Sequence, residues 1–564
     1  MTDSTCLAVP QEPLTQPRST RIGKALCLLI ALLSVSLNWI SAGDHPLYPP
    51  DEGRYASVSL NMAESNKWLV PMWFGHPHLT KPPLTYWVQA AAIRALGRDE
   101  WAMRLPGLIA GTGTVLLTYW FGCRLRNERT ALVAAGMLAV MPLHVVVTRL
   151  AITDPILTFF WTAALFCGWE AVESGRRRCA AAMWIAVALG LLTKGPIALC
   201  VPGILLAWLV LSGRFRSHAG RLQVFLGLPL AMLPLVLWGH LVLKQVPHAM
   251  EIWMHETVSR AEGTGDHPEP KWFYLPVFLG GAFPATTMLA LPGWNLPWSD
   301  AWKRMRAGGP VPLLLLAVVL PFIMFSAIAG KLMTYLLPIC PAMALLSAVM
   351  LEGWLTGEHD TPKPGRRPPD VIYTLTITSV LIVVGVVTAD SLLGWGHLEA
   401  VVPLAVLPLS ALGMWYLWRK GRSSRAAALA LYFLGSASTW FWVYEIEDVV
   451  IEPMSGKALV EDLNAELGTT QYALATYGFT ETTLSFYHDS EVRRIETPES
   501  LAEFCRAAKA EGMAVRILFD QHIWDVVVSK WPEVSSQYHP LETRKRWPND
   551  ASIVMEPVTS GTDQ

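Results

Sequence analysis

Residues 154–178 read DPILTFFWTAALFCGWEAVESGRRR, and this stretch shows the plan on which much of the chain is built. An Asp-Pro pair opens it, a long and mostly apolar run follows, and three arginines close it. About 20 apolar residues form a helix about 30 Å long, which matches the hydrocarbon core of a bilayer. The stretch therefore predicts a membrane-spanning helix with a polar beginning and a basic end.

The composition extends this interpretation to the whole chain of 564 residues. Only 16% of the residues are charged and 52% are hydrophobic, whereas soluble domains are about a quarter charged. The 25 tryptophans fit aromatic belts at membrane interfaces. The net charge of -1 gives no argument for nucleic-acid binding. Because the eight cysteines form no CxxC pair, neither a disulfide framework nor a cysteine metal site is indicated.

Similar apolar runs predict a polytopic α-helical membrane protein with about 13 transmembrane helices. The runs lie near 22–41, 104–123, 130–148, 154–173, 179–193, 196–213, 222–243, 273–293, 311–329, 333–352, 371–389, 399–418 and 424–443. The two runs flanking Lys194 meet at Thr193-Lys194-Gly195-Pro196 and could instead form one re-entrant feature. The first run follows three basic residues, and we interpret it as an uncleaved anchor rather than a signal peptide.

Basic residues alternate between the loops and predict the orientation of the chain. The Arg- and Lys-rich segments are those around residues 18–24, 124–129, 176–178, 214–221, 303–306, 363–367 and 419–425. The positive-inside rule places these loops in the cytoplasm. The segments 44–103 and 244–272, and the tail from about 445, then lie outside. Within the first outer segment, the amphipathic stretches 52–65 and 84–97 are expected to lie in the membrane interface.

The tail has a different pattern and is expected to form a small C-terminal periplasmic α/β domain. Its short apolar runs at 472–476, 515–519 and 552–555 are typical of strands, and 501–510 and 521–530 are typical of helices. No nucleotide-binding fingerprint occurs in this region. We therefore divide the chain into residues 1–445, which form the membrane part, and 446–564, which form the α/β domain.

Ionisable residues collect at the predicted outer boundary of the membrane. They are Asp51, Lys81, Asp154, Lys194 and Lys331. Ionisable groups at membrane depth are costly and usually mark a functional site. Carboxylates beside several cations suit an anionic ligand that is held while a group is transferred. Each residue also has a structural alternative, because the acids suit helix N-termini and the lysines suit interfacial anchors.

Five ordered motifs together resemble one enzyme family. They are DEGRYA at 51–56, KPPLTYW at 81–87, RLAITDP at 149–155, TKGP at 193–196 and KLMTYLLP at 331–338. The set is similar to the bacterial lipid A aminoarabinose transferases, membrane glycosyltransferases of the GT-C fold related to the protein O-mannosyltransferases. The resemblance implies transfer of a sugar, 4-amino-4-deoxy-L-arabinose or a related one, from a polyprenyl-phosphate donor to lipid A or another envelope acceptor. It also implies a multi-pass protein of the inner membrane, with its active site on the periplasmic face.

The same resemblance implies roles for individual residues. Asp51 is expected to be the catalytic carboxylate and Asp154 a second essential acid. The implied contacts to the donor or acceptor phosphate are Arg54, Lys81, Tyr335, Lys194 and Lys331.

The resemblance further implies a bound divalent metal ion, held by a glutamate before the Lys-Pro pair and a histidine of the second outer loop. Here Thr80 occupies the glutamate position. His255 remains as the histidine, and His76 or His78 could take the place of the missing ligand.

Two other functions stay open. A protein O-mannosyltransferase-like enzyme would use the same kind of donor on secreted proteins. A lipid or solute transporter is the alternative outside enzymes, although transporters often contain internal repeats and midplane charges. We find no repeat in this sequence, and its charges lie at one face.

Overall fold

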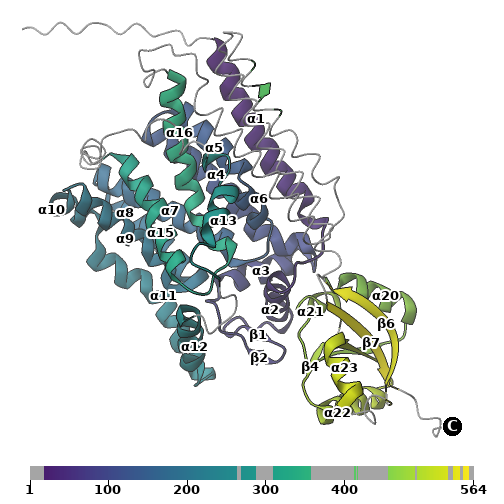
Figure 1. Cartoon of the computed structure of the whole chain (residues 1–564). Helices are drawn as coiled ribbons and strands as arrows, with labels where there is room; N and C mark the ends of the chain where they lie inside the picture. Colours follow the sequence, from purple (N-terminus) through teal and green to yellow (C-terminus); the bar gives the residue numbers. More distant parts are fainter. Residues whose placement is uncertain are drawn as a thin grey trace, which may run out of the picture.

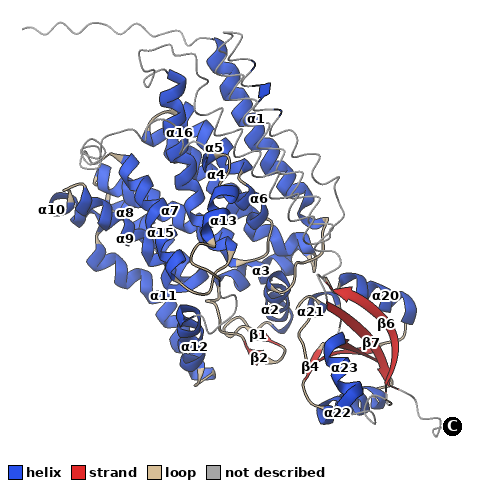
Figure 2. Cartoon of the chain, in the orientation of Figure 1, coloured by secondary structure: helices blue, strands red, loops and turns tan. Residues whose placement is uncertain are grey.

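A computed structural model describes residues 18–262, 269–286, 309–356, 455–489, 492–530, 538–546 and 550–557, together with a few isolated positions. Helices from the first 356 residues make up the larger body of the molecule. A smaller part, built from residue 455 onward, contains a β-sheet and its own helices (Figure 2). Figure 1 shows this smaller part beside α2, at the edge of the helical body.

The helical body follows the apolar runs of the sequence. Its helices, with their short 3-10 segments, are α1 (Arg18–Ile40), η1 (Ser41–Gly43), α2 (Asp51–Ser65), α3 (Leu84–Leu96), α4 (Glu100–Leu125), α5 (Glu128–Val140), α6 (Pro142–Thr148), α7 (Thr153–Ser174), α8 (Arg177–Lys194), η2 (Gly195–Leu199), α9 (Cys200–Leu211), α10 (Phe215–His218), η3 (Ala219–Leu222), α11 (Val224–Gln245), α12 (Ala249–Glu262), α13 (Tyr274–Gly281), α15 (Pro310–Ala327), η6 (Met333–Ile339) and α16 (Cys340–Thr356). A small hairpin of β1 (Met72–Trp73) and β2 (His76–Pro77) connects α2 to α3.

Five of the described helical stretches are long and apolar enough to cross a membrane. A sixth is the pair α5 and α6, which bends by 62° at the Met141–Pro142 junction. The sequence predicts one straight run at 130–148, and Pro142 breaks it because proline cannot donate the helical hydrogen bond. These stretches establish a polytopic helical membrane protein. The predicted spans at 371–389, 399–418 and 424–443 fall wholly or largely outside the described residues.

The apolar stretch Arg177–Leu211 contains a chain reversal at Lys194. By length and composition it counts as a single candidate span of 35 residues. However, a Cβ placed on Gly190 would lie only 3.0 Å from the Cβ of Ala198, whereas residues eight apart in one helix are about 12 Å apart. The close approach shows that η2 folds back on the end of α8, and α9 then returns along α7. The break predicted around Lys194 is therefore present, and Lys194 lies at the turn.

Helix α7 separates two chemically different ends of the helical body. It is 22 residues long, so it spans about 33 Å, and Asp154 lies in its first turn. At its last turn, Glu170 pairs with Arg124 at 2.6 Å and Glu173 pairs with Arg214 at 2.7 Å. The arginine-rich loops after α4, α7 and α9 thus gather at one end of α7, and Asp154 lies at the other.

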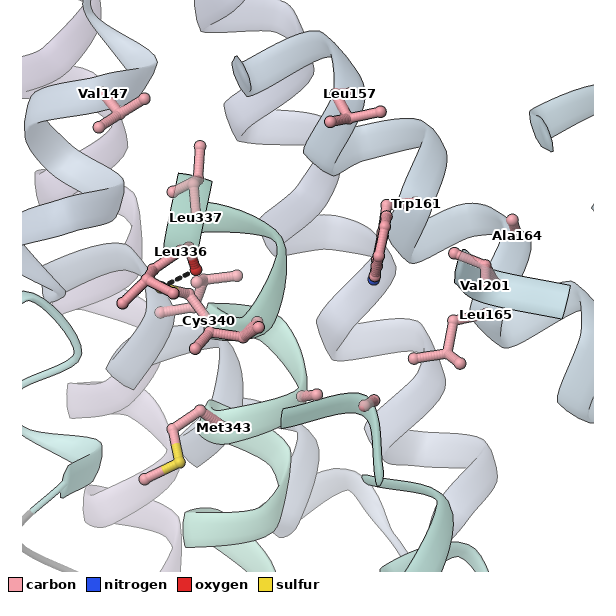
Figure 3. Packing of buried hydrophobic residues seen from close by; sticks show 14 of the residues in the cluster. Val147, Leu157, Trp161, Ala164, Leu165, Val201, Leu336, Leu337, Cys340 and Met343 are labelled. Carbon is pink, nitrogen blue, oxygen red and sulfur yellow. Dashed lines mark hydrogen bonds between the residues drawn. The ribbon is translucent and has the colours of Figure 1, made fainter. Parts of the chain in front are cut away.

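The core beneath Asp154 is formed by α7, α9 and the segment from η6 to α16. In Figure 3, Trp161 and Leu165 of α7 lie between Val201 of α9 on one side and Leu336 and Cys340 on the other. This packing connects the beginning of α7 to η6, which carries Tyr335.

The smaller part is a five-stranded sheet in the order β4-β3-β5-β7-β6. Its elements are α20 (Lys457–Leu467), β3 (Tyr472–Tyr477), α21 (Leu484–Tyr487), β4 (Arg493–Ile495), α22 (Pro498–Ala510), β5 (Ala514–Asp520), α23 (Gln521–Lys530), β6 (Tyr538–Arg546) and β7 (Asp550–Pro557). Strands β4, β3 and β5 are parallel, and β7 and β6 are antiparallel to their neighbours. Residues of α22 pack on one face of the sheet and residues of α20 on the other. The strands and helices expected in this region are present at their predicted places.

Candidate functional site

The first acidic residue of the site begins an interfacial helix. Pro50 immediately precedes α2 and cannot donate a helical hydrogen bond, and Asp51 and Glu52 occupy the first turn, where the helix dipole favours negative charge. The Asp51 carboxylate is paired with the guanidinium of Arg54, one turn further along α2. About a third of each side chain remains exposed, 35% for Asp51 and 27% for Arg54. This pair can therefore be reached from outside the protein.

A second acid–base pair joins three helices. The carboxylate of Asp154, at the start of α7, lies 2.7 Å from the ammonium of Lys194, at the end of α8. The same ammonium lies 4.3 Å from the centre of the Tyr335 ring, a cation–π contact with η6. Because α7 and α8 are antiparallel neighbours, the beginning of one meets the end of the other. The two predicted residues are brought together by this topology.

Tyr55 connects the two pairs. It lies one turn after Asp51 on α2, stacks on Tyr86 and shares a side-chain hydrogen bond with Thr153. Burial is the largest cause that raises the pKa of Tyr55 well above its usual value, and the charges of Asp51 and Asp154 act in the same direction. Both carboxylates therefore lie within electrostatic range of one neutral hydroxyl group. The two predicted acids belong to one site.

The loop before α3 adds a third ion pair. The Lys81 ammonium lies 3.2 Å from the carboxylate of Glu256 on α12, so the two outer segments meet here. Nearby, Thr80 Oγ1 is 3.0 Å from His78 Nε2. Burial, followed by the positive charges of Arg54 and Lys81, lowers the pKa of His78 to about 4. The imidazole is consequently neutral at neutral pH, and the positive charge in this corner comes from Arg54 and Lys81.

Lys331 lies in a different environment from the other predicted cations. It is buried, and its ammonium donates to the carbonyls of Glu269 at 2.7 Å and Ala329 at 3.3 Å. Its hydrogen bonds hold the segment before α13 to the segment before η6. The structure therefore places Lys331 near Tyr335 in the chain, but with its charge directed at backbone oxygens.

The sequence analysis missed a buried ion pair directly beside Asp51. Glu52 and Arg104 form two hydrogen bonds, at 3.0 and 2.8 Å, and both side chains are almost completely buried. Glu52 also accepts from the backbone N–H groups of Tyr48 and Ala151. Arg104 could have been identified from the sequence as a charged residue in need of a partner, because it is a lone charge at the start of an apolar run. Its partner could not be identified from local sequence.

The residues around His255 do not fit a resident divalent metal ion. His255 is exposed on α12, and His76 is exposed on β2. Thr80 and His78 are hydrogen-bonded to each other. Within the described part of the chain, no three His, Cys, Asp or Glu side chains gather as a metal-ligand group. The divalent metal therefore remains a prediction of the sequence, and no step of the reaction below depends on it.

Comparisons with known proteins identify relatives of this chain. Residues 80–238 match the model of the dolichyl-phosphate-mannose-protein mannosyltransferase family. The chain is 30% identical over 460 residues to the undecaprenyl phosphate-α-4-amino-4-deoxy-L-arabinose arabinosyl transferase of Edwardsiella ictaluri, covering 76% of this chain and 78% of that protein. The protein of the same name from Erwinia tasmaniensis is 31% identical over 314 residues. That alignment covers 54% of this chain and spans 55% of the length of the relative.

The fold has a counterpart among solved structures. The crystal structure of ArnT from Cupriavidus metallidurans bound to undecaprenyl phosphate matches with a TM-score of 0.74 and 20% identity. The match covers 93% of this chain and 97% of that one. At this identity the likeness concerns the fold, and it agrees with the polytopic helical architecture described above. The resemblance inferred from the five motifs is confirmed: the chain belongs to the family of undecaprenyl phosphate-α-4-amino-4-deoxy-L-arabinose arabinosyl transferases.

Proposed function

We propose that this protein transfers 4-amino-4-deoxy-L-arabinose, or a related sugar, from a polyprenyl-phosphate donor to lipid A or another envelope acceptor. The relatives are named for a donor built on undecaprenyl phosphate. The observation that carries the proposal is the meeting of the pairs Asp51–Arg54 and Asp154–Lys194 around Tyr55. Paired carboxylates and cations suit a reaction in which negative charge moves between phosphates.

The proposed chemistry is a single displacement at the anomeric carbon of the sugar. An oxygen of the acceptor phosphate forms a bond to this carbon while the bond from the carbon to the donor phosphate oxygen breaks. The electron pair of the broken bond leaves with the polyprenyl phosphate, whose negative charge increases by one. The acceptor phosphate loses one negative charge as it becomes a diester. One displacement inverts the configuration at the anomeric carbon.

Cations near the donor phosphate would lower the barrier because they stabilise this developing charge. We assign this role to Arg54, Lys81 and Lys194, with the Tyr335 hydroxyl as a further contact. Lys331 remains a weaker candidate, since it would have to exchange a carbonyl oxygen for the phosphate. An acceptor phosphate needs little deprotonation. We therefore propose that Asp51 positions the acceptor and balances charge, and that Asp154 holds Lys194 in place.

The finer topology belongs to the same proposal. We propose about 13 spans in the inner membrane, with the site and the α/β domain on the periplasmic face. The arginine contacts at the far end of α7 support this orientation, since basic loops favour the cytoplasm. The boundary between the two domains is proposed at residues 445 and 446. On the periplasmic side, a lipid-linked donor supplies the sugar without an exported nucleotide sugar.

Mass spectrometry of lipid A from a deletion strain tests the donor and acceptor classes together. We expect an amino-pentose mass on the lipid A phosphates to disappear on deletion and to return with the wild-type gene. Unchanged lipid A in the deletion strain would contradict the proposed acceptor.

A mannosyltransferase-like activity on secreted proteins is the second candidate, favoured by the family match over residues 80–238. The same strains distinguish it from the first candidate. If this activity is the correct one, envelope proteins lose a hexose mass on deletion while lipid A is unchanged. If the protein instead acted as a transporter, purified protein would transfer no sugar between added donor and acceptor.

A further inference from the structure

A segment of the α/β part packs directly on the helix that carries Asp51. We call residues 481–487 the docking segment. A Cβ placed on Gly53 would lie only 2.7 Å from the backbone of both Thr482 and Thr483. One turn later, Ser57 Oγ donates to the carbonyl of Thr482 at 2.8 Å. Two chain regions more than 400 residues apart are therefore in close backbone contact at the first two turns of α2.

Hydrogen bonds at Tyr487 hold the end of the docking segment in place. The Tyr487 hydroxyl donates to Glu100 at 3.1 Å and accepts from the backbone N–H of Leu47 at 2.7 Å. Glu100 also receives the Lys457 ammonium at 2.7 Å. Leu47 lies just before α2, and Glu100 begins α4. The tyrosine therefore connects the entry to α2, the start of α4 and the α/β part at one point.

Two further contacts join the same parts of the molecule. Arg98 donates to the carbonyls of Phe486 and His488. In addition, Phe74 of the β1–β2 hairpin packs against the apolar cluster that α20 forms with residues of β3, β5 and β7. This hairpin leads directly to His78 and Lys81. The α/β part thus contacts both segments of the first outer loop that carry site residues.

None of the contacts described above involves a site residue. The contacting residues and the site residues nevertheless occupy the same two turns of α2. Gly53 and Ser57 are four residues apart and therefore share one face of α2. Asp51, Arg54 and Tyr55 alternate with them along the helix. A shift of α2 would consequently move the Asp51–Arg54 pair relative to Asp154, which belongs to α7. Displacements of about 1 Å at a reacting centre can reduce rates by about a hundredfold.

We propose that the docking segment positions α2 for sugar transfer, with Tyr487 as its principal positioning residue. The expected effect of this positioning on the reaction rate rests on the proposed function. It gives the α/β part a role that does not require contact with donor or acceptor. The polar contacts hold the entry to α2, and Gly53 permits the backbones to approach.

The test compares two tyrosine-to-phenylalanine variants in the purified full-length protein. Tyr487→Phe removes the hydroxyl that bridges Glu100 and Leu47. Tyr472→Phe is the matched control, because among the described residues the Tyr472 hydroxyl donates to Asn464, within the α/β part, at 2.9 Å. Both variants keep their rings. Transfer from a polyprenyl-phosphate aminoarabinose donor to lipid A gives kcat and KM, and amide hydrogen exchange reports the opening of α2 and residues 481–487.

We expect Tyr487→Phe to lower kcat by about tenfold, with a donor KM within about twofold of wild type. Exchange should become faster in α2 and in the docking segment. Tyr472→Phe should resemble wild type in both measurements. An unchanged kcat for Tyr487→Phe would overturn the inference, and so would an equal loss in both variants. If the wild-type protein transfers no sugar, the proposed function fails, but the exchange measurement still tests whether Tyr487 holds α2.

Discussion

Two neighbouring regions at the start of α2 use the same residue types in different ways. The buried clamp consists of Glu52 and Arg104 with the backbone groups that they bind. All five N–H donors of Arg104 have protein acceptors, and Glu52 accepts four hydrogen bonds. The proposed transfer site consists of the pairs Asp51–Arg54 and Asp154–Lys194. Within the described residues, each of its pairs is joined by one hydrogen bond between charged groups. Asp51 and Arg54 are partly exposed, whereas Lys194 is 13% and Asp154 only 6% exposed.

The difference teaches how to separate structural charges from functional ones. A guanidinium whose donors are all used by the protein cannot bind a phosphate without losing existing bonds. An ammonium has three donors, and Lys194 donates one to Asp154 while its charge faces the Tyr335 ring. It keeps capacity for an anionic ligand. Both regions contain acidic and basic residues at helix ends. They differ in how many hydrogen-bond donors of the basic residue the protein itself uses.

The largest effect is expected from Asp51→Asn. Asparagine keeps the shape but removes the charge that orients Arg54, and we expect sugar transfer to fall by about 10³-fold. The protein should stay folded, because Asp51 is partly exposed and outside the buried clamp. Activity is measured with purified protein, beside its apparent Tm in detergent. Glu64→Gln, at an exposed position on the same helix, is the control and should retain activity. A normal rate in Asp51→Asn would remove Asp51 from the mechanism.

Arg104→Met is expected to reduce the stability of the fold, whereas Asp51→Asn is expected to reduce activity alone. Replacing Arg104 leaves the carboxylate of Glu52 buried without a counter-charge, which costs about 3–5 kcal/mol. We expect a large loss of folded protein in detergent, measured by size-exclusion yield and thermal unfolding. The double variant Glu52→Gln with Arg104→Met should recover part of this loss, because the uncompensated charge is gone. Normal stability of Arg104→Met would show that the clamp does not hold the fold.

Smaller effects are expected from replacing two lysines, one on the transfer rate and the other on stability. Lys194→Ala should lower the transfer rate by about tenfold or more, because an ammonium with free donor capacity is lost from the transfer site. Lys331→Ala should mainly lower the apparent Tm, since it removes two bonds to backbone carbonyls. Comparing kcat with Tm for both variants separates the roles. If Lys331→Ala is as stable as wild type but loses transfer, Lys331 binds a phosphate after all.

The sequence predicted which charged residues come together at the start of α7 better than it predicted the contacts that support them. Asp154 and Lys194 were recognised because ionisable residues at helix ends are conspicuous in an apolar chain. Their contact follows from the antiparallel arrangement of α7 and α8. The predicted spans that fall on described residues coincide with helices, apart from the bend at Pro142 and the short α13, which ends at Gly281.

The supports were not predictable because they depend on tertiary contacts between distant segments. Glu52 and Arg104 are 52 residues apart, and no periodicity connects them. Glu256 meets Lys81 across 175 residues, and Tyr487 meets Leu47 across 440. Apart from the family resemblance, the local sequence made Asp51 and Glu52 equivalent as first-turn acids of one helix. Burial of the second and exposure of the first separate their roles, and burial is a property of the packed fold.

The smallest effect concerns the pH dependence of stability at His78. The pKa of His78 is about 4 in the folded protein, against about 6.5 in an unfolded chain. Between these values the unfolded chain binds the proton first, so stability falls as pH decreases from about 6.5 to about 4. Above pH 6.5 His78 contributes no pH dependence. Protonation in the folded state is opposed by burial and by Arg54 and Lys81, and Glu256 partly offsets them.

We therefore expect His78→Gln to reduce the acid-induced decrease in apparent Tm by a few degrees between pH 6.5 and 4, measured in detergent at constant ionic strength. His76→Gln is the matched control, because His76 is exposed two residues away and its replacement should leave the profile unchanged. Equal profiles for wild type and His78→Gln would mean that another group controls acid stability. A profile altered at pH 7 to 8 would contradict the assignment of His78 as a neutral, buried imidazole beside the transfer site.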